Sequence, residues 1–172
     1  MYDTYNTLNN TLDTCYLYGI DGIPLIPGIR FQGSTNFDGR DISVGALTNM
    51  SYLFAESRDL SHIDNILNWD VSKVTNMGYM FAGCTNLVDL NISNWNVVNL
   101  QYVSNMFYGC NNLSNASIDS VINMCINATN IANARFKNMR NTNSYSPFYG
   151  TKISNARYAN RWSDLTNAGW TY

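Results

Sequence analysis

Apolar residues recur in one short phrase that is written three times between residues 47 and 118. The two clearest copies begin at Met80 and Met106, each reading Met-Phe-x-Gly-Cys, and their starts lie 26 residues apart (106 − 80). A looser copy begins with Leu53 and Phe54. A fixed period of about 20 to 50 residues is typical of solenoids and other repeat architectures. The pattern therefore predicts a short stacked array whose two ends need caps.

The spacing inside each unit predicts its elements. Leu87, Leu90 and Ile92 suit a short parallel strand whose inward residues stack on the next unit, whereas the run from Val74 to Phe81 has the apolar spacing of a helical turn. We therefore expect an α/β fold, a short leucine-rich-repeat-like solenoid with one strand and one helical turn in each unit of about 26 residues. Its caps are expected to be β-rich at the N-terminus and helical at the C-terminus.

Three segments follow from this pattern. Residues 1–46 do not repeat, and their apolar runs are cut by Gly and Pro, which predicts an N-terminal cap or attachment segment of short strands and turns. Residues 47–118 form the three-unit repeat array. Residues 119–172 are expected to form a C-terminal helical cap and tail that close the other end of the array.

Within the C-terminal segment, Ser117 is the expected N-cap of a helix that presents one apolar stripe to the array and ends near residues 127–130. Residues 141–149 are expected to be a polar loop. A second short helix is expected at residues 159–168, stopped by Gly169. The tryptophan and tyrosine that follow are expected to pack back on the cap.

Composition and charge exclude several classes of partner. The chain has 172 residues, of which 45% are hydrophobic, and this fits one domain. Only 13% of residues are charged and the net charge is −2, so we expect neither a nucleic acid nor an anionic lipid partner. Apolar runs fall short of the roughly 20 residues that cross a bilayer, which predicts no membrane insertion. The first residues lack the features of a secretory signal peptide.

The four cysteines, Cys15, Cys84, Cys110 and Cys125, do not have the spacing of a metal site. Zinc sites usually need closely spaced cysteine pairs or histidines, and the only histidine is His62. Cys84 and Cys110 occupy the same repeat position, where a small apolar thiol packs well in an array. We therefore predict buried free thiols, with no metal and no cofactor.

The repeat itself resembles a known family. The run from Trp69 to Leu87 and the run from Leu90 to Trp95 resemble the BspA-like repeat of bacterial surface proteins, a leucine-rich-repeat relative of about this period. The resemblance implies an adhesin or surface-displayed binding protein with no catalytic residues to carry over. The ending, residues 112–118 and 162–171, resembles short repeat proteins encoded by bacteriophages of Gram-positive hosts. The first unit departs from the family phrase, since Glu56 and its neighbour serine replace Gly-Cys.

Catalytic constellations are sparse, and the sequence predicts that the protein is not an enzyme. His62 is adjacent to Ser61 at an outward strand position, which does not suit a nucleophile and its base. The carboxylates of Asp64, Asp70 and Asp89 fall on separate units rather than across one cleft, as glycoside cleavage would need.

Two features are candidates for binding. Trp69 and Trp95 are 26 residues apart and should stack; exposed, they would form a platform for sugar rings or protein side chains, whereas buried, the reading we favour, they belong to the core. The other candidate is the outward strand face, where leucine-rich arrays commonly bind and where a merely solvated polar face looks the same. The candidate binding surface comprises His62, Asp64, Trp69, Asp89, Asn91, Trp95, Asn115 and Ser117.

These observations lead to one expectation of function. We expect a noncatalytic phage virion component, a fibre, tail or head decoration, that acts as an adhesin for a host cell-surface glycan or protein. The alternatives are a structural virion protein that contacts other virion proteins, and a bacterial surface adhesin or interaction module. The expected location is the virion, or else the bacterial cell surface or the extracellular space. Homo-oligomerisation is left open.

Overall fold

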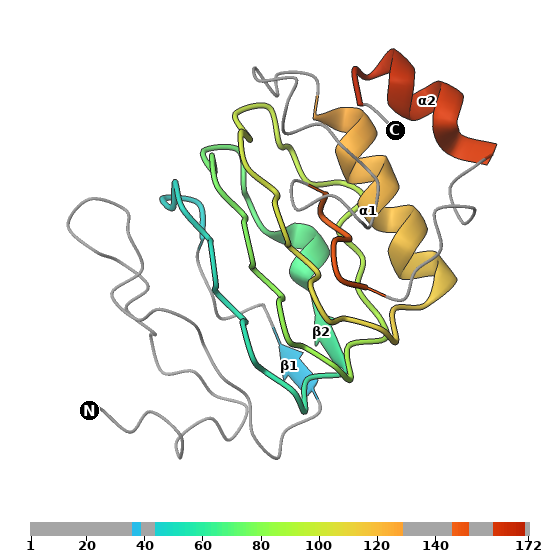
Figure 1. Cartoon of the computed structure of the whole chain (residues 1–172). Coiled ribbons are helices and arrows are strands. Elements are labelled where there is room, and N and C mark those ends of the chain that lie inside the picture. The colour runs from blue at the N-terminus through green and yellow to red at the C-terminus, as the bar shows by residue number, and fades with distance from the viewer. Residues whose placement is uncertain (1–35, 39–43, 129–145, 152–159, 171–172) are drawn as a thin grey trace.

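The computed structural model describes residues 36–38, 44–128, 146–151 and 160–170. Its elements, in chain order, are strands β1 (Asn36–Asp38) and β2 (His62–Asp64), the 3₁₀ helix η2 (Ile66–Asn68), and helices α1 (Asn115–Asn127) and α2 (Trp162–Asn167) (Figure 1). Of the cap predicted for residues 1–46, the described residues include only 36–38 and 44–46. Cys15 lies outside the described residues.

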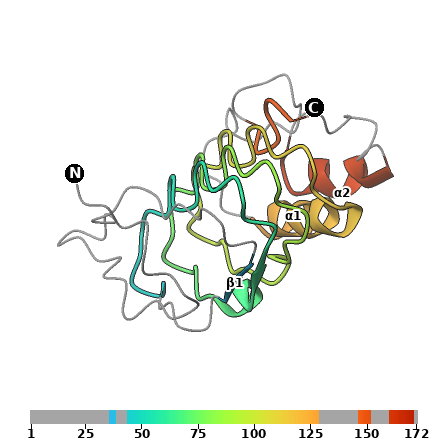
Figure 2. The same ribbon diagram turned by 90° about the horizontal axis from the view of Figure 1, so that it is seen from below.

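Successive units lie side by side and run parallel (Figures 1 and 2). Strands β1 and β2 form a two-stranded parallel sheet in which Asn36 lies opposite His62 and Asp38 lies opposite Asp64. Isolated parallel bridges extend this arrangement through the later units, joining Asn49 with Asn76, His62 with Asp89, and Asn76 with Tyr102. The backbone is therefore in register from one unit to the next.

The Met-Phe phrase forms the second line of contact between units. The backbone N–H of Phe54 donates to the carbonyl oxygen of Met80 at 2.8 Å, and that of Phe81 donates to Met106 at 2.9 Å. The helical turn expected from Val74 to Phe81 is a series of tight turns, because Tyr79 has a φ of 57° and N–H groups that a helix would use internally bond to the next unit.

Columns of aromatic rings fill the core between the units. Phe54, Phe81 and Phe107 are fully buried and stack with centroid separations of 5.4 and 5.3 Å. Trp69 and Trp95 form a second column with a separation of 6.4 Å. No single unit could bury these rings alone, so each unit is stabilised mainly by its neighbours.

Residues 146–151 form a fourth copy of the turn. The polar loop expected at residues 141–149 was therefore wrong for residues 146–149, and residues 141–145 lie outside the described part of the chain. Phe148 is fully buried and stacks on Phe107 at 5.8 Å, while the N–H of Phe107 donates to the carbonyl oxygen of Pro147 at 2.8 Å. The signal was present in the sequence, because Phe-Tyr-Gly occurs at residues 107–109 and again at 148–150. It was missed because helix α1 and the residues after it interrupt the 26-residue period.

Helix α1 begins earlier than expected. Its N-cap is Ser114, whose Oγ accepts a hydrogen bond of 3.2 Å from the N–H of Ser117, so Ser117 is in the first turn and is not the cap. Four of the five residues predicted for the apolar stripe, Ile118, Val121, Ile122 and Cys125, are buried, whereas the fifth, Ile126, is partly buried against the core. Met124, which was not predicted, is buried as well.

Helix α2 packs beside α1 (Figure 1). It ends as predicted before Gly169, which has a φ of 84° and donates its N–H to Thr166. Trp170 returns to the core: it is 2% exposed, and its Nε1 atom donates to the carbonyl oxygen of Cys125 at 2.8 Å. The expected docking of this tryptophan is confirmed, whereas Tyr172 lies outside the described residues.

The thiols of Cys84, Cys110 and Cys125 are free and buried, as predicted. Burial raises the pKa of the Cys110 and Cys125 thiols. Each thiol of the repeat position reaches back one unit: the Sγ atom of Cys84 donates to the carbonyl oxygen of Phe54, and that of Cys110 to Phe81, both at 3.0 Å. These cysteines therefore have a structural role.

No helix in the described part of the chain is long and apolar enough to cross a membrane.

Candidate functional site

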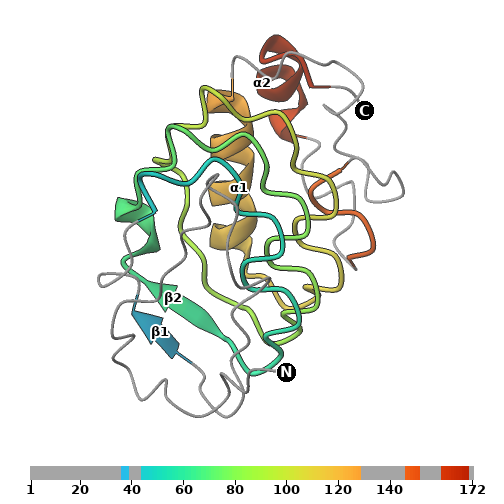
Figure 3. The ribbon, with the colours of Figure 1, turned by 90° about the vertical axis from the view of Figure 1, so that its left-hand side faces the viewer.

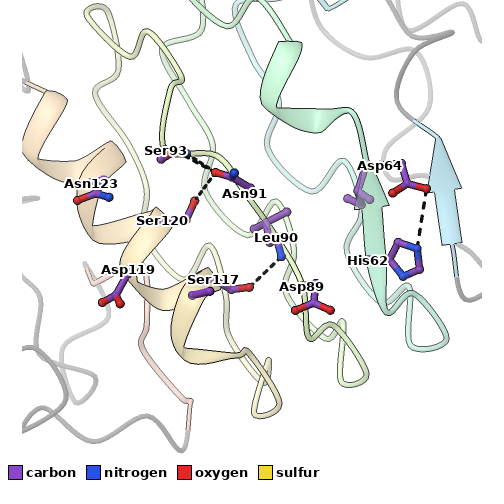
Figure 4. A pocket seen from close by; sticks show the side chains of 12 residues that line it. His62, Asp64, Asp89, Leu90, Asn91, Ser93, Ser117, Asp119, Ser120 and Asn123 are labelled. Atoms are coloured by element: carbon purple, nitrogen blue, oxygen red, sulfur yellow. Dashed lines mark hydrogen bonds and ion pairs between the residues drawn. The ribbon is translucent and has the colours of Figure 1, made fainter.

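A groove with a volume of about 730 Å³ lies between β2 and α1, with the segment 89–93 as its floor (Figure 4). Side chains from all three elements meet there, although their positions in the sequence span two units and a helix. The groove is open to solvent, and nine of its twelve lining residues have polar side chains. Its lining residues are His62, Ile63, Asp64, Asp89, Leu90, Asn91, Ser93, Ala116, Ser117, Asp119, Ser120 and Asn123.

The wall formed by α1 is joined to the floor through two serine hydroxyls. The N–H of Leu90 donates to the Oγ atom of Ser117 at 2.8 Å (Figure 4). The N–H of Ile92 donates to the Oγ atom of Ser120 at 2.6 Å. Ser117 in turn donates to the carbonyl oxygen of Val88 at 2.8 Å. One unit earlier, β2 pairs with the backbone of β1, whereas here serine side chains satisfy backbone groups at the edge that an added unit could cover.

This arrangement changes the role predicted for Ser117. Its side chain was expected to be a binding group on the outward face, but the residue is 2% exposed and its hydroxyl already makes hydrogen bonds to two backbone groups. Ser117 therefore positions the helix, and a ligand in the groove would meet its neighbours instead.

The groove has a negative charge. Asp64, Asp89 and Asp119 are exposed carboxylates in its lining, and the lining contains no lysine or arginine among the described residues. Among the described residues of the lining, His62 has the only other titratable side chain; its Nε2 atom is 3.9 Å from the Oδ2 atom of Asp64. Such a surface attracts groups that are positively charged or donate hydrogen bonds.

Asn91 lies at the centre of the floor and is exposed. Its Oδ1 atom accepts hydrogen bonds from the hydroxyl of Ser93 at 2.9 Å and from that of Ser120 at 3.4 Å. These bonds fix the orientation of the amide (Figure 4). A fixed amide beside carboxylates is the kind of group that gives a polar ligand its orientation.

The two tryptophans do not contribute to this surface. Trp69 is 6% exposed and Trp95 is 1% exposed, and the Nε1 atom of Trp95 donates to the carbonyl oxygen of Ile66 at 2.9 Å. The alternative that placed both rings in the core is confirmed, and a platform made of these rings is excluded. Asn115 is exposed on the first turn of α1 but lies outside the groove lining.

The structure thus brings together His62, Asp64, Asp89, Asn91 and Ser117 from the predicted surface. Sequence reasoning missed the contribution of α1, which was treated only as a cap. The signal was a second stripe on the same helix: Ala116, Asp119, Ser120 and Asn123 recur at i, i+3, i+4 and i+7, opposite in character to the apolar stripe.

A second hollow, with a volume of about 680 Å³, adjoins the groove and shares Ser93 and Asn123 with it. Arg161 lies in this hollow, and its guanidinium group bonds to two side chains. Its Nη2 atom donates to the Oδ1 atom of Asn123 at 2.8 Å, and its Nε atom donates to the Oδ2 atom of Asp164 at 3.0 Å. Arg161 therefore links α2 to α1.

Two arrangements that would indicate catalysis or metal binding can be checked near the groove, a cluster of metal-ligating side chains and a serine beside a histidine. In the described part of the chain, no three side chains among His, Cys, Asp and Glu are grouped to hold a metal ion. The hydroxyl of Ser61 is 3.2 Å from the Nδ1 atom of His62. This contact joins two adjacent residues at the start of β2, of which His62 lines the groove and Ser61 does not.

A family model described as "Mycoplasma protein of unknown function, DUF285" matches residues 29–148 of the chain. The matched region contains the repeated phrase, β2, the groove and helix α1. No curated protein and no solved structure matches the chain.

Proposed function

The chain belongs to the DUF285 family of Mycoplasma proteins of unknown function, and we propose that it is a noncatalytic adhesin that binds a cell-surface glycan or protein. The observation that carries this proposal is the groove between β2 and α1. It is large enough for a small sugar or a peptide segment, and three separate elements supply its polar lining. We therefore propose that the groove binds a ligand.

The chemistry of the groove narrows the partner. The exposed carboxylates of Asp64, Asp89 and Asp119 accept hydrogen bonds, and the amide of Asn91 is held in one orientation. Sugar hydroxyls, amino groups of amino sugars, and lysine or arginine side chains all donate to such acceptors. The proposed partner therefore presents donors or positive charge.

The finer form of the proposal is a BspA-like, leucine-rich-repeat solenoid displayed on a phage particle as a fibre, tail or head decoration. It is supported by the resemblance of the repeated phrase and of the ending. A second candidate, a bacterial surface adhesin, is favoured by the family description, which names Mycoplasma proteins. Neighbouring tail or capsid genes would support the phage form, and their absence would remove it.

Retention of the labelled full chain on intact bacterial cells and on purified cell envelopes tests the proposal. We expect retention by the wild type and at least a tenfold weaker association for Asp89→Asn and Asp119→Asn. The matched control is Asp70→Asn, which removes an exposed carboxylate outside the groove lining. A wild-type chain that no cell or envelope retains would contradict the adhesin proposal.

A further inference from the structure

The turns of the successive units lie on the side of the units away from β2 (Figure 3). Exposed tyrosines occur in these turns. Tyr52 is 48% exposed and Tyr79 is 37% exposed, and their rings stack at 4.9 Å with an interplanar angle of 3°. Tyr108 is also 48% exposed and pairs with Tyr149 at 5.9 Å. Because the units are in register, the two pairs occupy neighbouring columns three residues apart. We call Tyr52, Tyr79, Tyr108 and Tyr149 the tyrosine face.

The backbone under the first pair is strained. Tyr52 has a φ of 62° and Tyr79 a φ of 57°, in the left-handed region that asparagine and glycine enter far more readily than aromatic residues do. The third unit has Asn105 at the same position, with a φ of 57°. Tyrosine is thus present where asparagine would meet the backbone requirement at lower cost. Such strain at an exposed position points to a use for the side chain.

A glycine makes room for the second pair. Gly150 has a φ of 69°, and a Cβ atom there would overlap the ring of Tyr108. The ring of Tyr108 therefore lies close to the backbone of Gly150 in the fourth unit. Both pairs are held in fixed positions, so ordering them on binding costs little conformational entropy.

The geometry of the rings indicates the chemistry of the partner. The rings of Tyr52 and Tyr79 are stacked, and those of Tyr108 and Tyr149 meet at an interplanar angle of 35°, so in each pair the partner ring takes up one ring face. A sugar ring would need a free aromatic face, whereas edges and hydroxyls suit the peptide groups and side chains of a protein. Tyrosine surrounded by Ser, Asn and Gly is also the composition of antibody paratopes, which bind proteins.

The charged residues beside the tyrosines indicate which protein could bind this surface. From residue 49 to 58 and in the matching turns at 76–85 and 102–111, the only charged residues are Glu56 and Arg58. They form an exposed ion pair of 2.8 Å beside the tyrosines. A neutral surface with one charge of each sign can meet a copy of itself across a twofold axis, Glu56 facing Arg58, without repulsion.

From these observations we propose that the tyrosine face is an interface between two copies of this chain. The proposal goes beyond binding in the groove, since the two surfaces share no residue. A dimer of this kind would present two grooves at once and so strengthen attachment to a surface that repeats its ligand.

Sedimentation equilibrium of the full chain, from micromolar to millimolar concentration, tests this proposal. We expect a mass that rises with concentration toward twice that of the chain. Tyr52→Asn combined with Tyr79→Asn should weaken the association at least tenfold. This variant should fold, because asparagine occupies the same left-handed position in the third unit; circular dichroism checks it.

The matched control is Val88→Ser, which removes an exposed apolar side chain, 37% exposed, outside the tyrosine face. It should associate as the wild type does. A wild type that is monomeric over the whole range would overturn the proposal, and so would a dimer that the tyrosine variant leaves intact or that Val88→Ser weakens equally.

Discussion

The hydroxyl of Ser120 accepts a hydrogen bond of 2.6 Å from the backbone N–H of Ile92, and this bond joins helix α1 to the floor of the groove. A residue on a helix thus does what the backbone of a further unit would do. The helix ends the backbone pairing along this floor and at the same time supplies one wall of the groove. The docking of α1 therefore both covers this backbone edge and builds one wall of the candidate site.

Replacing Ser120 with alanine should lower the free energy of unfolding by about 1 to 3 kcal/mol, because the buried N–H of Ile92 would lose its acceptor. Urea unfolding measures the change. Ser163→Ala, at an exposed position of α2, is the control and should change stability by less than about 0.5 kcal/mol. Equal stability of the two variants would show that the hydroxyl does not hold the helix in place.

Phe148→Ala should lower the free energy of unfolding by about 3 to 5 kcal/mol, as expected for a fully buried ring that ends an aromatic column. Thermal or urea unfolding provides the measurement. If residues 146–151 were a solvated loop, the loss would stay below about 1 kcal/mol. The result therefore decides whether a fourth unit is part of the fold.

Two glycine substitutions should separate backbone strain from close contact. Gly109→Ala should cost about 1 to 2 kcal/mol, because φ is 77° and the nearest atoms to an added Cβ are 3.8 Å away. Gly83→Ala, with a φ of 78°, should cost more, because its Cβ would also displace the carboxylate of Glu56. The same unfolding assay applies to both, and the reverse order would refute this account of the turn.

Burial raises the pKa of Cys110 and Cys125 in the folded chain, so these thiols stay protonated where an unfolded thiol, with a pKa of about 8.5, begins to ionise. The unfolded state then binds fewer protons, and stability should fall as pH rises above about 8.5. Urea unfolding at a series of pH values measures this, and Cys125→Ala should make the free energy of unfolding fall less steeply with pH.

The burial of both thiols also predicts their reactivity. A thiol reagent at pH 8 should label Cys110 and Cys125 only in urea. Labelling of the folded chain would contradict their burial.

The sequence predicted the features that follow directly from periodicity. The columns of Phe54, Phe81 and Phe107, the buried thiols and the apolar stripe of α1 each repeat at a spacing that burial explains. The fourth unit escaped prediction because the intervening residues put Phe148 out of period. The leucine-rich-repeat solenoid class stays a prediction, as do the absence of enzymatic activity and the phage origin.

The candidate site was harder to predict, because contacts between units and a helix create it. His62, Asp64, Asp89 and Asn91 could be placed on one face by counting residues along the units. The wall of Asp119, Ser120 and Asn123 depends on how α1 docks, and that is decided by serine hydroxyls whose partners are backbone groups 27 and 28 residues earlier. Local pattern does not reveal such long-range pairs.

The most direct test of the central claim, that the groove is the binding surface, is a titration of purified cell envelopes with two tryptophan variants of adjacent residues. Ala116→Trp places a bulky side chain in the groove wall, whereas Asn115→Trp places it on the same turn of α1 outside the lining. We predict that Ala116→Trp weakens binding at least tenfold while Asn115→Trp binds as the wild type does. Equal binding by Ala116→Trp and the wild type would contradict the claim.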